Sequence, residues 1–222
     1  MKNLISKIVR RKELKESMNI KIDNPIPNIK VSLNKNPDGS FSVVLTQLGA
    51  IETKVLSSIE PGGIAKIGSR EYIVLEQDGD TTAVIAKEFV KKMTFGNDGD
   101  YTKSGIRKYL NGEFYEEVAA AIGVDNIIEH TVDLMADDGT GKGVSCKDKI
   151  SLLTTDRYRK YRKFLPAYGS WWWLATQVSA AINDYARSVC CVGSGGTLGW
   201  DGCGDCLGVR PFLILKSSIS VS

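Results

Sequence analysis

The chain has 222 residues, of which 42% are hydrophobic and 25% are charged. This composition is typical of a globular protein with a substantial apolar core, built as one domain or as one domain with a small appendage. The formal net charge is only +3, which argues against a nucleic-acid-binding protein, because such proteins carry a concentrated basic face. No stretch approaches the roughly 20 apolar residues of a membrane span, so we expect no membrane insertion.

Residues 1–16 carry charges throughout and lack the continuous apolar core of a secretory signal. We therefore expect cytoplasmic synthesis without a signal peptide, with later presence in a phage particle or release by cell lysis as open alternatives. The number of cysteines is odd, which fits poorly with a disulfide scaffold, so we expect them to be mostly reduced. The five cysteines are Cys146, Cys190, Cys191, Cys203 and Cys206.

Residues 1–57 are expected to form a separate small module made of a helix and a β-hairpin. Residues 1–16 have one apolar side and are otherwise largely basic, which predicts a short amphipathic helix. Two extended runs follow, at 29–33 and 41–45, and the sequence Asn-Pro-Asp-Gly at 36–39 predicts a turn between them. The apolar side of the helix consists of Leu4, Ile5, Ile8 and Val9.

Residues 58–222 are expected to form one α+β domain. Ser104 can cap a helix over 104–121 whose apolar residues follow helical spacing, and Gly112 lies where this helix could split in two. A second, short helix is expected over 156–161. The expected strands and extended segments cover 64–68, 71–76, 81–86, 127–128, 131–134 and 149–153, and a polar loop covers 136–143.

Several short segments of this domain follow one another in a characteristic order and spacing. They are Ile67-Gly68, Glu71-Tyr72-Ile73-Val74-Leu75, Ser104-Gly105-Ile106-Arg107-Lys108-Tyr109-Leu110-Asn111 with Phe114-Tyr115, Ile150-Ser151-Leu152-Leu153-Thr154, Trp172-Trp173-Leu174-Ala175-Thr176 and Gly208-Val209-Arg210-Pro211-Phe212. In this order they resemble a C-type-lectin-like domain family of unknown function, found in gut Firmicutes and mobile elements. The family is similar to the variable proteins of diversity-generating retroelements, in which a reverse transcriptase rewrites adenine-containing codons near the 3′ end of the gene.

The resemblance implies a C-type-lectin-like fold, with a twisted antiparallel sheet and two helices, and a function in ligand binding without catalysis. Two apolar segments, 171–174 and 208–215, flank the polar, glycine-rich stretch 177–207. Rigid flanks around a stretch of mixed chemistry are what a binding surface needs. We therefore expect 177–207 to bind a protein or cell-surface ligand. The candidate ligand-binding residues are Asn183, Asp184, Tyr185, Arg187, Ser194, Thr197, Trp200, Asp201 and Asp205.

Two other functions are weighed against this one. A phage or mobile-element protein could use the same surface to bind and inhibit one fixed host protein, and a metal or redox enzyme could use the cysteines. The sequence Cys203-Gly204-Asp205-Cys206 is a CxxC, but adjacent Cys190 and Cys191 would make a poor second half of a zinc site. His130 is the single histidine, which leaves little for a catalytic triad. We expect no catalytic residue, metal or cofactor, and a homo-oligomer stays an open alternative.

Two further features are expected to be structural. Arg210 lies between strand residues, where its planar guanidinium can hold carbonyl groups or a carboxylate. Successive residues of a strand face opposite ways, so Trp172 should face one side, with Trp171 and Trp173 on the other. Core packing on at least one of these sides is expected, because large aromatic side chains are mostly buried.

Overall fold

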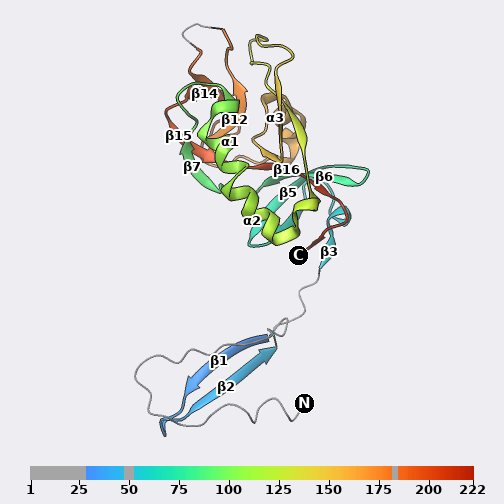
Figure 1. Cartoon of the computed structure of the whole chain (residues 1–222), viewed down its shortest axis with the longest axis vertical. Helices are drawn as coiled ribbons and strands as arrows, with labels where there is room; N and C mark the ends of the chain where they lie inside the picture. The colour runs from blue at the N-terminus through green and yellow to red at the C-terminus, as the bar shows by residue number, and fades with distance from the viewer. Residues whose placement is uncertain (1–28, 48–52, 182–184) are drawn as a thin grey trace. The chain divides into compact units, whose positions relative to one another are not determined.

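The computed structural model describes residues 29–47, 53–181 and 185–222 (Figure 1). The helix expected over residues 1–16 lies outside these described residues. The chain folds as two compact units, which are described separately below.

The boundary between the two units falls between residues 51 and 52, which is earlier than the boundary after residue 57 expected from the sequence. The reason is that strand β3 (Lys54–Val55) pairs antiparallel with β17 (Ser220–Val221) near the end of the chain. The next residue, Leu56, is completely buried. These residues therefore belong to the second unit, whose beginning and end lie side by side.

The described part of the first unit is the expected β-hairpin. Strand β1 (Ile29–Lys35) pairs antiparallel with β2 (Phe41–Gln47) along its whole length. The turn between them is closed by the Asn36 N–H, which donates to the Ser40 carbonyl at 2.8 Å, and by the Gly39 N–H, which donates to the Asn36 carbonyl at 3.0 Å. Gly39 has a φ of 81°, a conformation that favours glycine. The sequence-based prediction of this turn is confirmed.

The second unit has an α+β fold in which strands predominate. Its first large sheet has the order β11-β16-β6-β5-β4, with β8 also paired to β16, and its pairs are antiparallel. The strands are β4 (Ile64–Ile67), β5 (Arg70–Asp78), β6 (Thr81–Ala86), β8 (Ile127–Ile128), β11 (Ile150–Ser151) and β16 (Phe212–Lys216). The expected strand over 81–86 has the same bounds as β6, whereas the strand expected over 149–153 is shorter.

The second large sheet has the order β14-β13-β12-β15-β7. Its strands are β7 (Lys91–Thr94), β12 (Trp172–Gln177), β13 (Ser188–Val192), β14 (Leu198–Gly202) and β15 (Cys206–Val209). The pair β12 and β15 is parallel, because the β13–β14 hairpin lies on one side of β12 and the chain then returns to its other side. The structure thus has two main sheets and a parallel pair, where one antiparallel sheet was expected. A separate ladder pairs β9 (His130–Asp133) with β10 (Ser145–Asp148).

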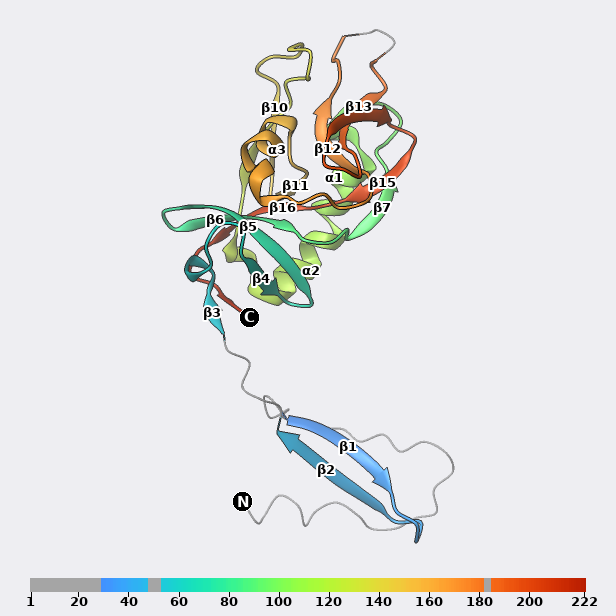
Figure 2. The ribbon, with the colours of Figure 1, turned by 180° about the vertical axis from the view of Figure 1, so that it is seen from behind.

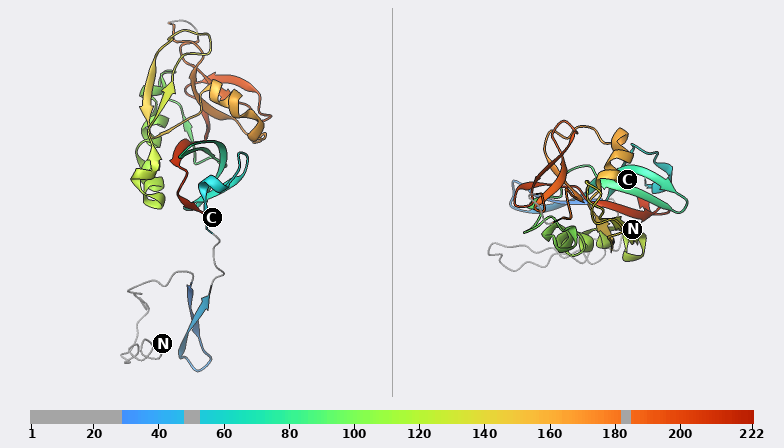
Figure 3. Two further views of the ribbon diagram at one scale, coloured as in Figure 1. Left: turned by 90° about the vertical axis from the view of Figure 1, so that its right-hand side faces the viewer. Right: turned by 90° about the horizontal axis from the view of Figure 1, so that it is seen from above.

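The helices are α1 (Gly105–Leu110), α2 (Glu113–Ile122) and α3 (Thr155–Tyr161). The helix expected over 104–121 is thus split at Gly112, where a Cβ would lie 2.9 Å from the Lys108 carbonyl oxygen. Figure 3 shows α1 and α2 on one side of the second unit and α3 on the other. No helix in the described residues is long and apolar enough to cross a membrane. The short 3-10 helices are Leu56–Ser58, Tyr101–Lys103, Val124–Asn126 and Arg162–Phe164.

A hydrophobic cluster lies on each face of strands β12 and β13. Trp173 and Cys191 belong to one cluster, and Trp172 and Cys190 belong to the other. This alternation confirms that Trp172 and Trp173 face opposite ways, and both are buried. Trp171 precedes the strand and is exposed. The core of the second unit therefore encloses the two central strands that precede the candidate binding surface.

Arg210 is buried and holds the two sheets together. Its Nε donates to the Ala86 carbonyl at 3.0 Å, and its guanidinium carbon lies 4.9 Å from the Trp172 ring centroid and 5.3 Å from that of Tyr168. Burial lowers the pKa of Arg210 to about 10. The structural position expected for this arginine is confirmed, but its contacts are one backbone carbonyl and two aromatic faces.

Candidate ligand-binding surface

The stretch expected to form the binding surface, residues 177–207, is divided by its burial. Strand β13 is buried at every residue, whereas the residues of β14 are exposed or half-buried. The expectation that the whole stretch is displayed is therefore wrong for β13, which lies between β12 and β14 with a hydrophobic cluster on each face. The apolar run Val189 to Val192 was the sequence signal for this buried strand.

Strand β14 and its neighbouring turns carry most of the candidate residues. Asn183 and Asp184 lie outside the described residues. Asp201 is half-buried. The exposed candidates are Tyr185, Arg187, Ser194, Thr197, Trp200 and Asp205.

The centre of this surface is a pair of exposed aromatic rings. Tyr185 and Trp200 are 48% and 55% exposed, and their ring centroids lie 5.7 Å apart in an edge-to-face arrangement. Leu198, which is also exposed, lies on the same face of β14 as Trp200 because it is two residues away. Tyr and Trp provide a large contact area with few rotatable bonds, so such a cluster is well suited to recognition.

An acidic pair lies on the other face of β14. The Asp201 side chain is hydrogen-bonded to that of Asp205, and its pKa is raised, first by burial and then by this hydrogen bond. The Gly202 N–H donates to Asp201 Oδ1 at 2.9 Å, which fixes the carboxyl group against the backbone. One face of β14 thus carries Leu198 and Trp200, with Tyr185 packed against Trp200, and the opposite face carries Asp201, with Asp205 hydrogen-bonded to it.

Comparison of the chain with protein-family models, curated proteins and solved structures gives no match. Its function is therefore inferred from the geometry of this surface and of its surroundings.

A second loop, which the sequence did not connect with the surface, lies beside residues 177–181. The Asp137 N–H donates to the Gln177 carbonyl at 3.0 Å, and the Ala180 N–H donates to Thr140 Oγ1 at 2.8 Å. Figures 1 and 2 both show the loop between β9 and β10 rising next to the loop that follows β12. The polar loop expected over 136–143 therefore forms the rim beside the candidate surface.

A cavity of about 340 Å³ opens at the base of this rim, between β9, α3 and the end of β12. Among its charged lining residues, Arg159 forms ion pairs with Asp137 at 3.3 Å and Asp156 at 2.9 Å. Arg157 also lines the cavity, and its Nη2 donates to the Thr131 carbonyl at 2.9 Å. Among the described residues, the buried Arg157 Nη1 has no hydrogen-bond partner in this lining. The ion pair between Arg159 and Asp137 connects α3 to the rim.

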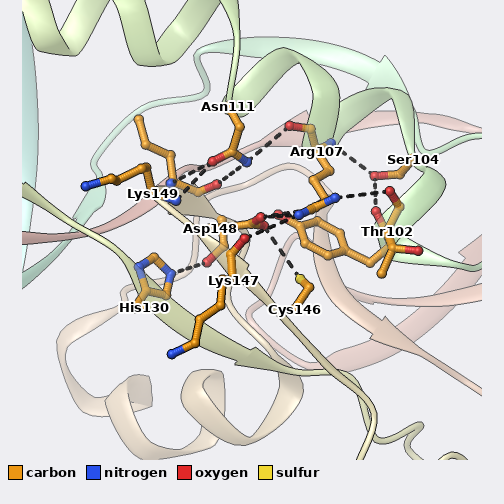
Figure 4. Close-up of polar contacts among 12 residues, drawn as sticks. Thr102, Ser104, Arg107, Asn111, His130, Cys146, Lys147, Asp148 and Lys149 are labelled. Carbon is orange, nitrogen blue, oxygen red and sulfur yellow. Dashed lines mark hydrogen bonds and ion pairs between the residues drawn. The ribbon is translucent and has the colours of Figure 1, made fainter. Parts of the chain in front are cut away.

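A polar cluster between α1 and β10 was missed by the sequence analysis (Figure 4). The Asp148 side chain is almost completely buried and forms an ion pair with Arg107 at 2.7 Å. The same guanidinium donates to the Thr102 carbonyl at 3.4 Å and the Lys147 carbonyl at 3.3 Å. Cys146 is next to Asp148, but burial, followed by that carboxylate, raises the pKa of its thiol. The cluster lacks an activated nucleophile and instead connects a helix to a strand.

Asn111 completes this connection at the end of α1. Its Nδ2 donates to the Ile150 carbonyl at 2.9 Å, and its Oδ1 accepts from the Lys149 N–H at 3.0 Å and from the Ile150 N–H at 3.2 Å. One amide side chain thus satisfies three backbone groups of a neighbouring segment. Both Arg107 and Asn111 lie in one of the segments that carry the family resemblance, but no spacing in the sequence indicated their partners.

The cysteines are arranged poorly for thiolate chemistry. Cys190 and Cys191 point to opposite faces of β13, and burial raises the pKa of their thiols to about 11 and about 12. Cys203 is buried and Cys206 is exposed, and both thiols are free. Within residues 29–47, 53–181 and 185–222, no three or more His, Cys, Asp or Glu side chains are grouped as metal ligands. A reactive thiol needs a lowered pKa, which is the opposite of what β13 provides.

Proposed function

We propose that this protein is a ligand-binding protein without catalytic activity, whose binding surface is formed by β14 and the exposed residues beside it. The observation that carries the proposal is the exposed aromatic pair Tyr185 and Trp200, placed next to a strand that is completely buried. A buried strand fixes the position of its neighbour, while exposed side chains contribute little to stability and remain available for contact. The ligand is a protein or a cell-surface molecule.

We also propose a C-type-lectin-like fold for the second unit, and a role as the target protein of a diversity-generating retroelement. The segments that carry the resemblance contribute to the buried frame, which includes β5, α1, β12 and β16. The candidate residues on β14 lie outside that frame, so rewriting their codons would change contacts with a ligand more than contacts within the core. Sequencing of the neighbouring DNA tests this: a near-copy of the gene's 3′ end, differing at adenines and next to a reverse transcriptase gene, is expected.

The aromatic pair gives the first prediction. The full chain is immobilised and exposed to host lysate and to intact cells, and the affinity of each bound component is measured. Replacing Trp200 or Tyr185 by Ala should weaken binding at least tenfold, because each loss of an aromatic anchor costs about 2 kcal/mol or more. Val124→Ala is the matched control, because Val124 is an equally exposed apolar residue (54%) in the 3-10 helix Val124–Asn126, outside the candidate surface.

The pattern of results separates the alternatives. Loss of binding in both surface variants with retention in the control supports the proposed surface. A single host protein recovered at one-to-one stoichiometry would favour a fixed-target inhibitor that uses the same residues. Binding that survives both surface substitutions would contradict the proposal.

A further inference from the structure

Strand β14 is the end strand of the second sheet, and its backbone is paired on one side. Two hydrogen bonds fix which of its residues bond toward β13. The Gly193 N–H donates to the Thr197 carbonyl at 2.8 Å, and the Cys203 N–H donates to the Arg187 carbonyl at 2.8 Å. Thr197 and Cys203, the residues immediately before and after β14, therefore both direct backbone hydrogen-bonding groups toward β13.

Hydrogen-bonded and non-hydrogen-bonded positions alternate along an antiparallel pair. Counting from Thr197, Gly199 and Asp201 also bond toward β13, where they oppose buried residues. The residues between them, Leu198 and Trp200, direct their backbone N–H and C=O groups away from the sheet. Their side chains are exposed as well.

The third outward residue, Gly202, already has both of its backbone partners. Its N–H donates to Asp201 Oδ1 at 2.9 Å, and its carbonyl accepts from the Asp205 N–H at 2.9 Å. No group of the described residues hydrogen-bonds to the outward N–H and C=O groups of Leu198 and Trp200. These four backbone groups form a short free edge.

Natural sheet edges are usually protected by lysines, prolines or bulges. The opposite edge of this sheet follows that rule, because β7 carries Lys91 and Lys92. Strand β14 has no Lys, Arg or Pro and instead exposes Leu198 and Trp200. An edge strand that exposes apolar side chains, and whose outward backbone groups have no partner among the described residues, is a template for another strand.

The acidic pair beside this edge indicates the charge of the strand that fits it. Asp201 and Asp205 lie together, and among the described residues neither forms an ion pair with Lys or Arg. A second copy of the chain fits poorly, because antiparallel pairing about Trp200 would place the two Asp201 side chains at diagonal positions about 7–8 Å apart. A strand that carries a cation would instead compensate the pair.

We propose that an extended segment of a partner protein adds to β14 as a new edge strand, with an apolar side chain beside Trp200 and a Lys or Arg beside Asp201. This inference rests on the proposed function and specifies the form of its ligand. The backbone groups of Leu198 and Trp200 provide the hydrogen bonds, and the side chains on the two faces of β14 select the sequence.

The experiment uses a phage-displayed library of random ten-residue peptides, selected on the full chain. Enriched peptides should alternate apolar residues and carry Lys or Arg, and a bound peptide should slow hydrogen exchange at the Leu198 and Trp200 amides. Leu198→Pro removes an outward N–H and spares the hydrogen bonds to β13, since proline is tolerated where the N–H faces solvent. It should weaken binding at least tenfold, whereas the control Leu198→Val, which keeps the N–H, should bind within about threefold of the natural chain.

A synthetic version of the best peptide provides a test that does not depend on the folding of a variant. Two N-methylated versions of this peptide are compared, one methylated at its odd-numbered amides and one at its even-numbered amides. Only one set of amides faces β14, so one version should lose binding and the other should bind nearly as well as the unmethylated peptide. Failure to enrich alternating basic peptides, or equal binding by the Pro and Val variants, would overturn the proposal. Self-association lost in Leu198→Pro would assign the edge to a second copy instead. If binding is lost in Trp200→Ala but kept in Leu198→Pro, the proposed binding surface stands and the addition of a strand to β14 is contradicted.

Discussion

His130 lies on β9, where burial controls its charge. Its Nε2 shares a hydrogen bond with Ser151 Oγ at 2.9 Å, and its ring meets the Phe212 ring edge-on with centroids 5.2 Å apart. Burial, followed by the nearby charge of Arg157, lowers the pKa of His130 to about 4. The imidazole is therefore neutral in the folded protein at neutral pH, which fits a structural position in the core.

This residue predicts a specific pH dependence of stability. The pKa of His130 is about 4 in the folded chain and about 6.5 when unfolded. The stabilisation of the folded chain by the neutral imidazole is therefore fully present above about pH 6.5 and is lost as the pH falls toward 4. Over this range the free energy of unfolding should fall by on the order of 3 kcal/mol. His130→Gln can still hydrogen-bond to Ser151 and does not titrate. Urea unfolding at pH 7 and pH 4.5 should show a smaller loss of stability in this variant, and parallel losses in both proteins would contradict the assignment.

Elements whose signals are local could be predicted from the sequence, and elements that depend on distant contacts could not. The turn at Asn36 to Gly39, the strand β6 and the split at Gly112 each follow from residues within a few positions. The connection of α1 to β10 depends on Arg107 and Asp148, which are 41 residues apart, and no periodicity links them. The sequence therefore indicated the three helices and the strands of the first large sheet, whereas it did not indicate β7, β13 or β14 of the second sheet or the arrangement of two sheets.

The ion pair between α1 and β10 gives a prediction for that pair of elements. Arg107→Leu leaves the Asp148 carboxylate buried without its partner, since the Asp148 side chain is 1% exposed. The free energy of unfolding should fall by about 3–5 kcal/mol. The double variant Arg107→Leu with Asp148→Leu removes the unpaired charge and should recover a large part of that loss. Urea unfolding of the three proteins measures this, and equal stability of the single and double variants would contradict it.

For the whole molecule, the candidate surface combines an exposed strand with a buried neighbour. The sequence correctly placed Tyr185, Arg187 and Trp200 at the surface, because polar and glycine-rich segments are seldom part of a core. It did not show that β13 is buried within the same stretch, because that depends on β12 and β14 pairing on its two sides. The loop near Thr140 was expected, but its place beside the surface was missed for the same reason, because it joins the surface through tertiary hydrogen bonds.

The most direct test of this arrangement compares changes on the exposed strand and its flanks with a change on the buried strand. The surface variant carries Tyr185→Ser, Arg187→Gln, Thr197→Asn and Trp200→Ser together, and the core variant carries Val189→Ala alone. Surface substitutions typically change stability by about 0.5 kcal/mol each, whereas removing two buried methyl groups costs about 2 kcal/mol.

The measurement is the free energy of unfolding in urea for the full chain and these two variants. The four surface changes together should cost no more than about 2 kcal/mol and leave a cooperative transition, so that they are no more damaging than Val189→Ala alone. A surface variant that unfolds, or that loses several times more stability than the core variant, would show that these side chains hold the fold together and would contradict the proposed display surface.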